Sequence, residues 1–124
     1  MLAKAKMHTV LAAVDIERAR RWYAEKLGLQ PIQDNEGELI YEAAGVRFMI
    51  YETPSAGTAQ NTVAGWDVDD LDAMMADLRG RGVVFEEYDY PEFKTVNGVV
   101  EFGDSRGAWF KDSEGNILAL NESH

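Results

Sequence analysis

The sequence predicts an α+β fold in which one βαβββ unit occurs twice in tandem. Asp15 and Gly28 recur 54 positions later as Asp69 and Gly82, so an acidic cap, an amphipathic stretch and a glycine stop are repeated. Short apolar segments bounded by Gly, Asn and Pro follow each repeat, as is typical of strands. Because the chain has 124 residues, either half alone would be marginally stable, and both copies are expected to share one domain, 1–124.

The first unit is expected over about residues 6–52. Residues 8–14 are apolar and predict a strand, after which Asp15 is placed to cap a helix. Ile16, Ala19 and Tyr23 fall on one face at helical spacing, and Gly28 supplies the left-handed residue that ends many helices. Three strands are expected to follow, at about 30–33, 38–43 and 46–51.

Small and polar residues at 53–61 predict a linker, after which the pattern restarts in a second unit at about 62–122. Asp69 is the expected cap of the second helix, which Gly80 and Gly82 end. An insertion at 89–107 has no counterpart in the first unit, and loops of that length are often functional. Strands are expected at 62–67, at 83–88, within 99–111 and at 116–120.

Composition excludes several classes of partner. The net charge of −10 repels nucleic-acid phosphates and anionic lipid, so neither nucleic acid nor a membrane surface is an expected partner. No apolar run approaches the roughly 20 residues that a membrane span needs. The absence of cysteine excludes disulfides and thiolate metal sites, and the first residues lack the pattern of a secretion signal, so a cytoplasmic location is expected.

Two motifs carry a family resemblance. The first is W-Y-x3-L-G-L from Trp22 to Leu29, and the second is D-x-x-G-N-x-L-x-L from Asp112 to Leu120. With the tandem repeat, they make the whole chain resemble the vicinal oxygen chelate superfamily, which includes glyoxalase I, fosfomycin-modifying enzymes, extradiol dioxygenases and bleomycin resistance proteins. The resemblance implies a curved, half-open barrel of mixed sheet with helices outside, a cleft between the units and a homodimer.

In metal-dependent relatives, the resemblance implies one ligand from the first and one from the last strand of each unit. The corresponding positions are His8, Met49, Thr62 or Val63, and Ala119. Only His8 can bind a divalent ion, whereas a catalytic site needs about three nitrogen or oxygen donors. The departure predicts no cofactor and no metal.

Alternation along the strands predicts the lining of the implied cleft. Polar and aromatic groups among apolar ones are typical of a small-molecule pocket. Met49 and Trp66 could instead fill the core, and Arg47 could pair with a carboxylate. The expected ligand-binding residues are His8, Arg47, Met49, Tyr51, Trp66, Trp109, Ala119 and Asn121.

We therefore expect a metal-independent protein that binds a small organic molecule, as resistance-type relatives do by sequestration. The alternative is a lyase-like or dioxygenase-like enzyme that uses His8 or Glu101 as acid or base, or that has an unconventional metal site; Glu101 would need apolar neighbours that raise its pKa. The second histidine, His124, ends the chain. A third possibility is a dimeric interaction module, and the aromatic residues of the insertion predict a lid or a dimer contact.

Overall fold

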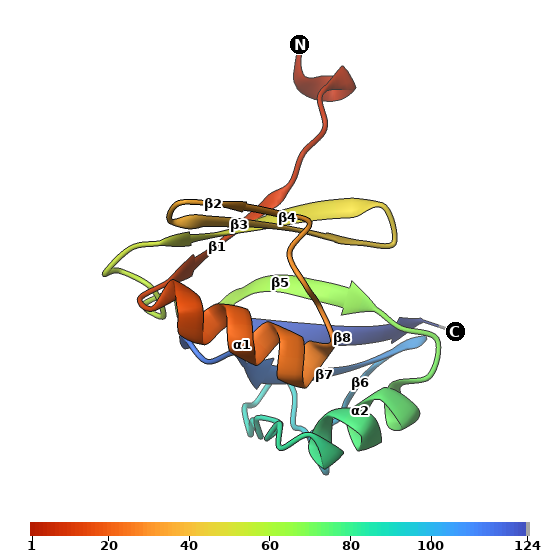
Figure 1. Cartoon of the computed structure of the whole chain (residues 1–124). Coiled ribbons are helices and arrows are strands. Elements are labelled where there is room, and N and C mark those ends of the chain that lie inside the picture. Colours follow the sequence, from red (N-terminus) through yellow and green to blue (C-terminus); the bar gives the residue numbers. More distant parts are fainter. Residues whose placement is uncertain (124) are drawn as a thin grey trace.

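A computed structural model describes residues 1–123 and contains two four-stranded mixed sheets, one from each repeated unit (Figure 1). Sheet A has the strand order β1-β4-β3-β2 and sheet B has the order β5-β8-β7-β6. The predicted fold of tandem repeats with sheets that do not close is confirmed. The elements are β1 (Thr9–Ala13), α1 (Ile16–Leu27), β2 (Gln33–Asn35), β3 (Glu38–Ala43), β4 (Val46–Glu52), β5 (Thr62–Asp67), α2 (Leu71–Gly80), β6 (Val100–Phe102), β7 (Ser105–Lys111) and β8 (Ile117–Ser123), preceded by a short 3-10 turn, η1 (Leu2–Lys4).

Helix α1 begins and ends where the sequence indicates. The Asp15 carboxylate accepts a hydrogen bond from the Arg18 amide at 3.0 Å, and Gly28 ends the helix at a φ of 69°. Helix α2 begins one residue later than expected, because Asp70 rather than Asp69 accepts from the Ala73 amide at 3.0 Å. Within the described chain no helix is both long and apolar enough to span a membrane.

The shift in α2 follows from a bulge in β5. The register between β5 and β8 changes between Thr62 and Ala64, which places one extra residue in the second unit before its helix. An alignment of the two units without a gap does not account for this extra residue. Asp69 therefore occupies the position before the cap, and the capping role passes to Asp70.

The strand predicted at 83–88 is wrong. Only Phe85 pairs there, in an isolated bridge to Phe110, and the segment continues into the insertion. Thr95 accounts for the turn, because its side-chain oxygen accepts from the Tyr88 amide at 2.8 Å and the Thr95 amide donates to the Tyr88 carbonyl at 2.9 Å. These bonds use backbone groups that a longer ladder would need. The predicted strand at 30–33 also begins later, as β2 from Gln33.

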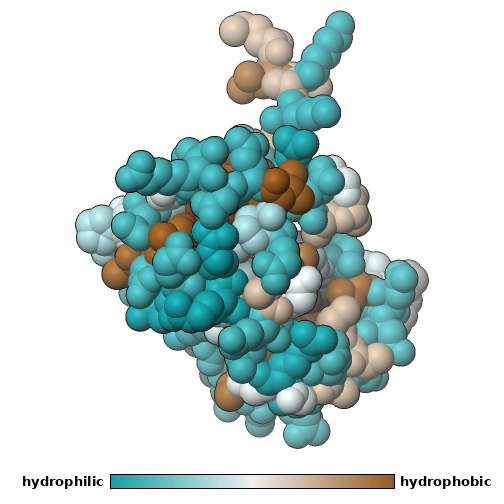
Figure 2. Space-filling view, in the orientation of Figure 1, coloured by the Kyte–Doolittle hydropathy of each residue, from teal (hydrophilic) through white to brown (hydrophobic). Residues whose placement is uncertain are grey.

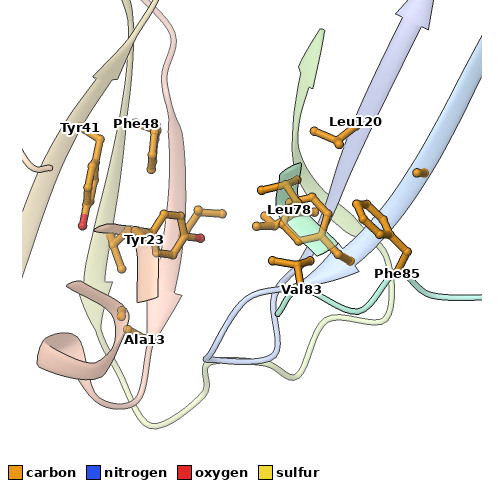
Figure 3. Packing of buried hydrophobic residues seen from close by; sticks show 14 of the residues in the cluster. Ala13, Tyr23, Tyr41, Phe48, Leu78, Val83, Phe85 and Leu120 are labelled. Carbon is orange, nitrogen blue, oxygen red and sulfur yellow. The ribbon is translucent and has the colours of Figure 1, made fainter. Parts of the chain in front are cut away.

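Both helices pack into one core that the two units share. Tyr23 of α1 is fully buried and its ring lies 5.7 Å from that of Tyr41 in sheet A. The neighbouring Trp22 stacks on Phe110 of sheet B, with ring centroids 6.3 Å apart. Figure 3 shows side chains of the two sheets, such as Phe48 and Leu120, directed into the space between them. We call this side of each sheet its helix face.

The two sheets meet along β1 and β5, which lie close together without forming a hydrogen-bonded ladder. The Asn116 side chain closes part of this seam by donating to the Ala12 carbonyl at 2.8 Å. Because α1 contacts the helix faces of both sheets, the opposite sides of the sheets point away from each other. We call these sides the open faces. Residues 1–8 are also exposed, and Figure 2 shows the N-terminal end projecting from the body.

Candidate functional site

The open face of sheet A carries the residues that alternation predicts. In β4, Phe48 and Ile50 are buried on the helix face, and Arg47, Met49 and Tyr51 consequently lie on the open face. The parallel register pairs Val10 of β1 with Met49. Val10 is 48% exposed and Tyr51 is 39% exposed, so this open face presents apolar and aromatic surface to solvent.

The open face of sheet B carries Trp109, Ala119 and Asn121. Their neighbours Ala108, Phe110, Leu118 and Leu120 are buried on the helix face. Register places Trp109 directly opposite Ala119, so the indole stands beside that small residue.

Trp109 also settles the register of β5. Its Nε1 donates to the Thr62 hydroxyl at 3.1 Å, which places Thr62 on the open face. Val63 instead packs against the hydrophobic core. Of the two residues that could occupy the family's third ligand position, Thr62 is therefore the one on the open face.

Trp66 does not lie where the sequence predicts. It pairs with Leu120, which is on the helix face, and its ring contacts that of Phe48 edge-on at 6.3 Å. The bulge after Thr62 reverses the faces for the remainder of β5. The simpler interpretation of Trp66, as a residue packed against the core, is the one that the structure supports.

The two candidate acid/base residues occupy different surroundings. His8 lies immediately before β1 and is exposed. Glu101 pairs with Arg106 across β6 and β7, and its side chain is 73% exposed with an ion pair to Arg106 at 3.5 Å. An acid/base role for Glu101 would need apolar surroundings, and its side chain is instead largely exposed and paired with a guanidinium. His124 lies outside the described residues.

In a single chain the two open faces do not converge. Met49 and Tyr51 face away from the core on sheet A, and Trp109 and Ala119 face away from it on sheet B. The core and α1 lie between these two sets, as the Trp22 contact with Phe110 requires. A cleft built from both sets within one chain is therefore contradicted by the arrangement of the sheets.

The insertion extends the open face of sheet B with aromatic rings. Phe93 lies 5.6 Å from Trp109 and 5.9 Å from Phe102, measured between ring centroids. Tyr88 contacts Trp109 at 5.4 Å and stacks on Tyr90 at 5.8 Å. Tyr90 and Phe102 are each about half exposed. Patches of this kind often mark binding surfaces.

Charges on the open faces are few and partly compensated. Arg47 pairs with Glu42 at 3.4 Å, as its simpler interpretation expects. Among residues 1–123, no three His, Cys, Asp or Glu side chains come together in a way that could hold a metal ion. The donor set at the four family positions, an imidazole, a thioether, a hydroxyl and a methyl group, does not suit a divalent ion.

The most strongly perturbed carboxyl group lies away from the open faces. Glu114, in the turn between β7 and β8, has a fully buried side chain that accepts from Arg18 at 2.7 Å. Burial alone would raise its pKa, but hydrogen bonds from Arg18, the Asp15 amide and Ser113 lower the pKa to about 2. A carboxylate held ionised in this way joins the two units and is not an acid/base candidate.

Ile40 is an open-face residue that the sequence analysis missed. It pairs with Met49 in the ladder between β3 and β4, and so faces the same side. The alternation of Leu39 and Tyr41, both buried, around Ile40 is the sequence signal that points to it. Its side chain widens the apolar surface around Met49.

Comparison with known proteins identifies the family. The model of the Glyoxalase/Bleomycin resistance protein/Dioxygenase superfamily matches residues 7–120. The chain belongs to this superfamily. Among curated proteins, no relative matches the chain.

Solved structures of several other proteins have the same fold. A glyoxalase/bleomycin resistance protein from Catenulispora acidiphila is 24% identical, with a TM-score of 0.68 and coverage of 96% of this chain and 98% of the other. TnmS3, an antibiotic-binding protein from a Streptomyces species, is 23% identical, with a TM-score of 0.71 and coverage of 100% and 99%. The fosfomycin resistance protein FosX from Listeria monocytogenes, solved with Mn(II), is 16% identical, with a TM-score of 0.70 and coverage of 98% and 91%.

Proposed function

We propose that this chain binds a small organic molecule without a metal ion and acts by sequestration. The observation that carries the proposal is the donor set on the open faces. Met49 and Ala119 offer no nitrogen or oxygen donor, and Thr62 is already engaged by the Trp109 indole at 3.1 Å. A divalent ion would be left with too few ligands. Apolar surface remains, which suits burial of an organic ligand.

We infer that the binding cleft forms between two copies of the chain. Sheet A of one protomer would pack its open face opposite the open face of sheet B of its partner. A two-fold axis then generates two equivalent clefts and covers both open faces at once. The half-exposed Val10 and Phe102 support this arrangement, because isolated chains seldom leave such apolar faces uncovered.

The chemistry of this cleft follows from its walls. Met49 and Ile40 from one protomer supply apolar contacts, and Trp109 from the other supplies a ring for stacking. Tyr51 and Asn121 supply hydrogen-bonding groups. An apolar or aromatic molecule with a few polar substituents is the ligand that such walls favour. Similarity in fold to an antibiotic-binding protein is consistent with a role in resistance by sequestration.

The experiment is a binding screen of apolar and aromatic antibiotics against the purified protein by calorimetry, with and without a chelator. We expect binding that the chelator leaves unchanged, and native mass spectrometry should give one ligand per protomer in a dimer. Ala119→Trp should abolish binding because the indole fills the cleft. Ala59→Trp, in the exposed linker, is the matched control and should bind normally. Binding that is lost with chelator and restored by Mn²⁺ would overturn the proposal.

A further inference from the structure

A cavity of about 350 Å³ lies between the two units, mainly on the helix side of the molecule. The ends of α1 and α2 form one side, and the end of β5 forms another. We call it the Trp66 crevice. Its principal apolar walls are Leu27, Leu29, Trp66, Leu78, Phe110 and Leu120.

The walls of the Trp66 crevice belong to the packed core. Leu78 and Leu120 are each 4% exposed and Phe110 is fully buried, although all three border the space. The crevice is open to solvent, and the charged residues Lys26, Asp67, Asp77 and Arg81 also border it. Buried apolar side chains thus line a space that solvent can enter, as in many small-molecule pockets.

A second cavity of about 290 Å³ adjoins the first. Both are bordered by Ala43, Trp66 and Asp67, so the indole of Trp66 stands between them. The Trp66 ring meets Phe48 edge-on, and the half-buried indole borders both spaces. A change in the Trp66 side-chain torsion would therefore redistribute space between the cavities.

Hydrogen bonds cross the lower rim of the crevice. The Lys26 amine of α1 donates to the Arg81 carbonyl just after α2, and the Arg81 guanidinium donates back to the Glu25 carbonyl at 3.3 Å. Arg81 also pairs with Asp77 at 3.4 Å. The Lys26 and Arg81 hydrogen bonds link the end of α1 to the end of α2 across this rim.

We propose that the Trp66 crevice binds a small, uncharged aromatic or alicyclic molecule in each protomer, at a site separate from the open-face cleft. Its volume falls within the roughly 300–1,000 Å³ of known ligand pockets. Two carboxylates, Asp67 and Asp77, and two cations, Lys26 and Arg81, border the crevice, so its rim favours neither an anion nor a cation and suits an uncharged ligand.

The test uses naphthalene as the probe and the methyl group of Met74, which lines the crevice, as the reporter. We expect naphthalene to shift the Met74 methyl and the Trp66 indole N–H resonances with saturation at one equivalent per protomer. Ala43→Phe, which fills the space shared by both cavities, should weaken this binding at least tenfold. Should that variant fail to fold, Met74→Trp fills the crevice from its other wall, with the Trp66 N–H as reporter.

Ala119→Trp separates this site from the open-face cleft. It should leave the naphthalene shifts at Met74 unchanged even though it blocks the cleft of the proposed function. The inference is wrong if naphthalene fails to shift the Met74 and Trp66 resonances of the unmodified protein. It is equally wrong if the shifts persist in Ala43→Phe, or if they disappear in Ala119→Trp.

Discussion

The carboxylate of Glu114 in the second unit accepts hydrogen bonds from the Arg18 guanidinium of the first unit at 2.7 Å and 3.1 Å. The same Oε1 atom accepts from the Val14 and Asp15 amides at 2.8 Å and 2.9 Å, immediately before α1. One side chain of the turn between β7 and β8 thus accepts hydrogen bonds from the backbone amides just before the first helix. The two units are joined by this contact as well as by their shared core.

Replacing Glu114 should destabilise the protein through Arg18 and the two amides. Glu114→Ala leaves the half-exposed Arg18 guanidinium and the two amides without this acceptor and should lower the free energy of unfolding by about 2 kcal/mol. Glu114→Gln retains one acceptor oxygen and should cost less. Chemical denaturation measures both variants. Equal losses for the two would contradict a role for the acceptor.

The same carboxylate predicts a loss of stability in acid. The pKa of Glu114 is lowered from 4.5 to about 2 in the folded protein, so below pH 4.5 the unfolded chain binds the proton more readily. The stabilisation is fully present above about pH 4.5 and is lost as the pH falls toward 2, by at most about 3 kcal/mol. Denaturation midpoints across this range should fall less steeply in Glu114→Gln.

The cap of α2 can be tested with adjacent residues. Asp70→Ala removes the acceptor for the Ala73 amide and should cost about 1 kcal/mol. Asp69→Ala removes no cap and should change the free energy of unfolding by less than about 0.5 kcal/mol. Thermal unfolding of the two variants under one buffer condition compares them. A larger loss for Asp69→Ala would mean that the cap is at the position the repeat first suggested.

Gly57 should tolerate no side chain. It has a φ of +76°, and a Cβ there would clash with the Glu114 carbonyl oxygen. Gly37 has nearly the same φ of +77° but open space around it. Gly37→Ala should therefore cost about 1 kcal/mol from backbone strain alone, and Gly57→Ala should cost more because the linker must move. Similar denaturation midpoints for Gly37→Ala and Gly57→Ala would contradict the predicted clash at Gly57.

Charge on an open face should separate the proposed dimer. Val10→Glu places a carboxylate on the apolar open face of sheet A and should shift the protein to a monomer, because the buried charge would have no partner. Val84→Glu introduces the same charge at a site that is 81% exposed and outside both open faces. Sedimentation velocity compares the two. A dimer that survives Val10→Glu would contradict pairing through this face.

Sequence patterns predicted the repeat, both sheets, the α1 caps and most open-face residues, since each depends on neighbours along the chain. Met49 and Trp109 follow from alternation in regular strands. The face of Trp66 and the capping role of Asp70 were not predicted, because one bulge changes both. Nothing in the sequence at Thr62–Ala64 distinguishes a bulged strand from a regular one. The divergence of the open faces was also missed. This divergence depends on the contact between Trp22 and Phe110, two residues that are far apart in the chain.

The division of each sheet into two faces separates two kinds of constraint. Substitutions among residues such as Leu11, Ile50 or Leu118 disturb close packing and are costly. Substitutions among Met49, Thr62 and Ala119 leave that packing intact. Selection can therefore alter the open faces almost independently of whether the chain folds, which helps one architecture persist among proteins that retain about a fifth of their residues in common.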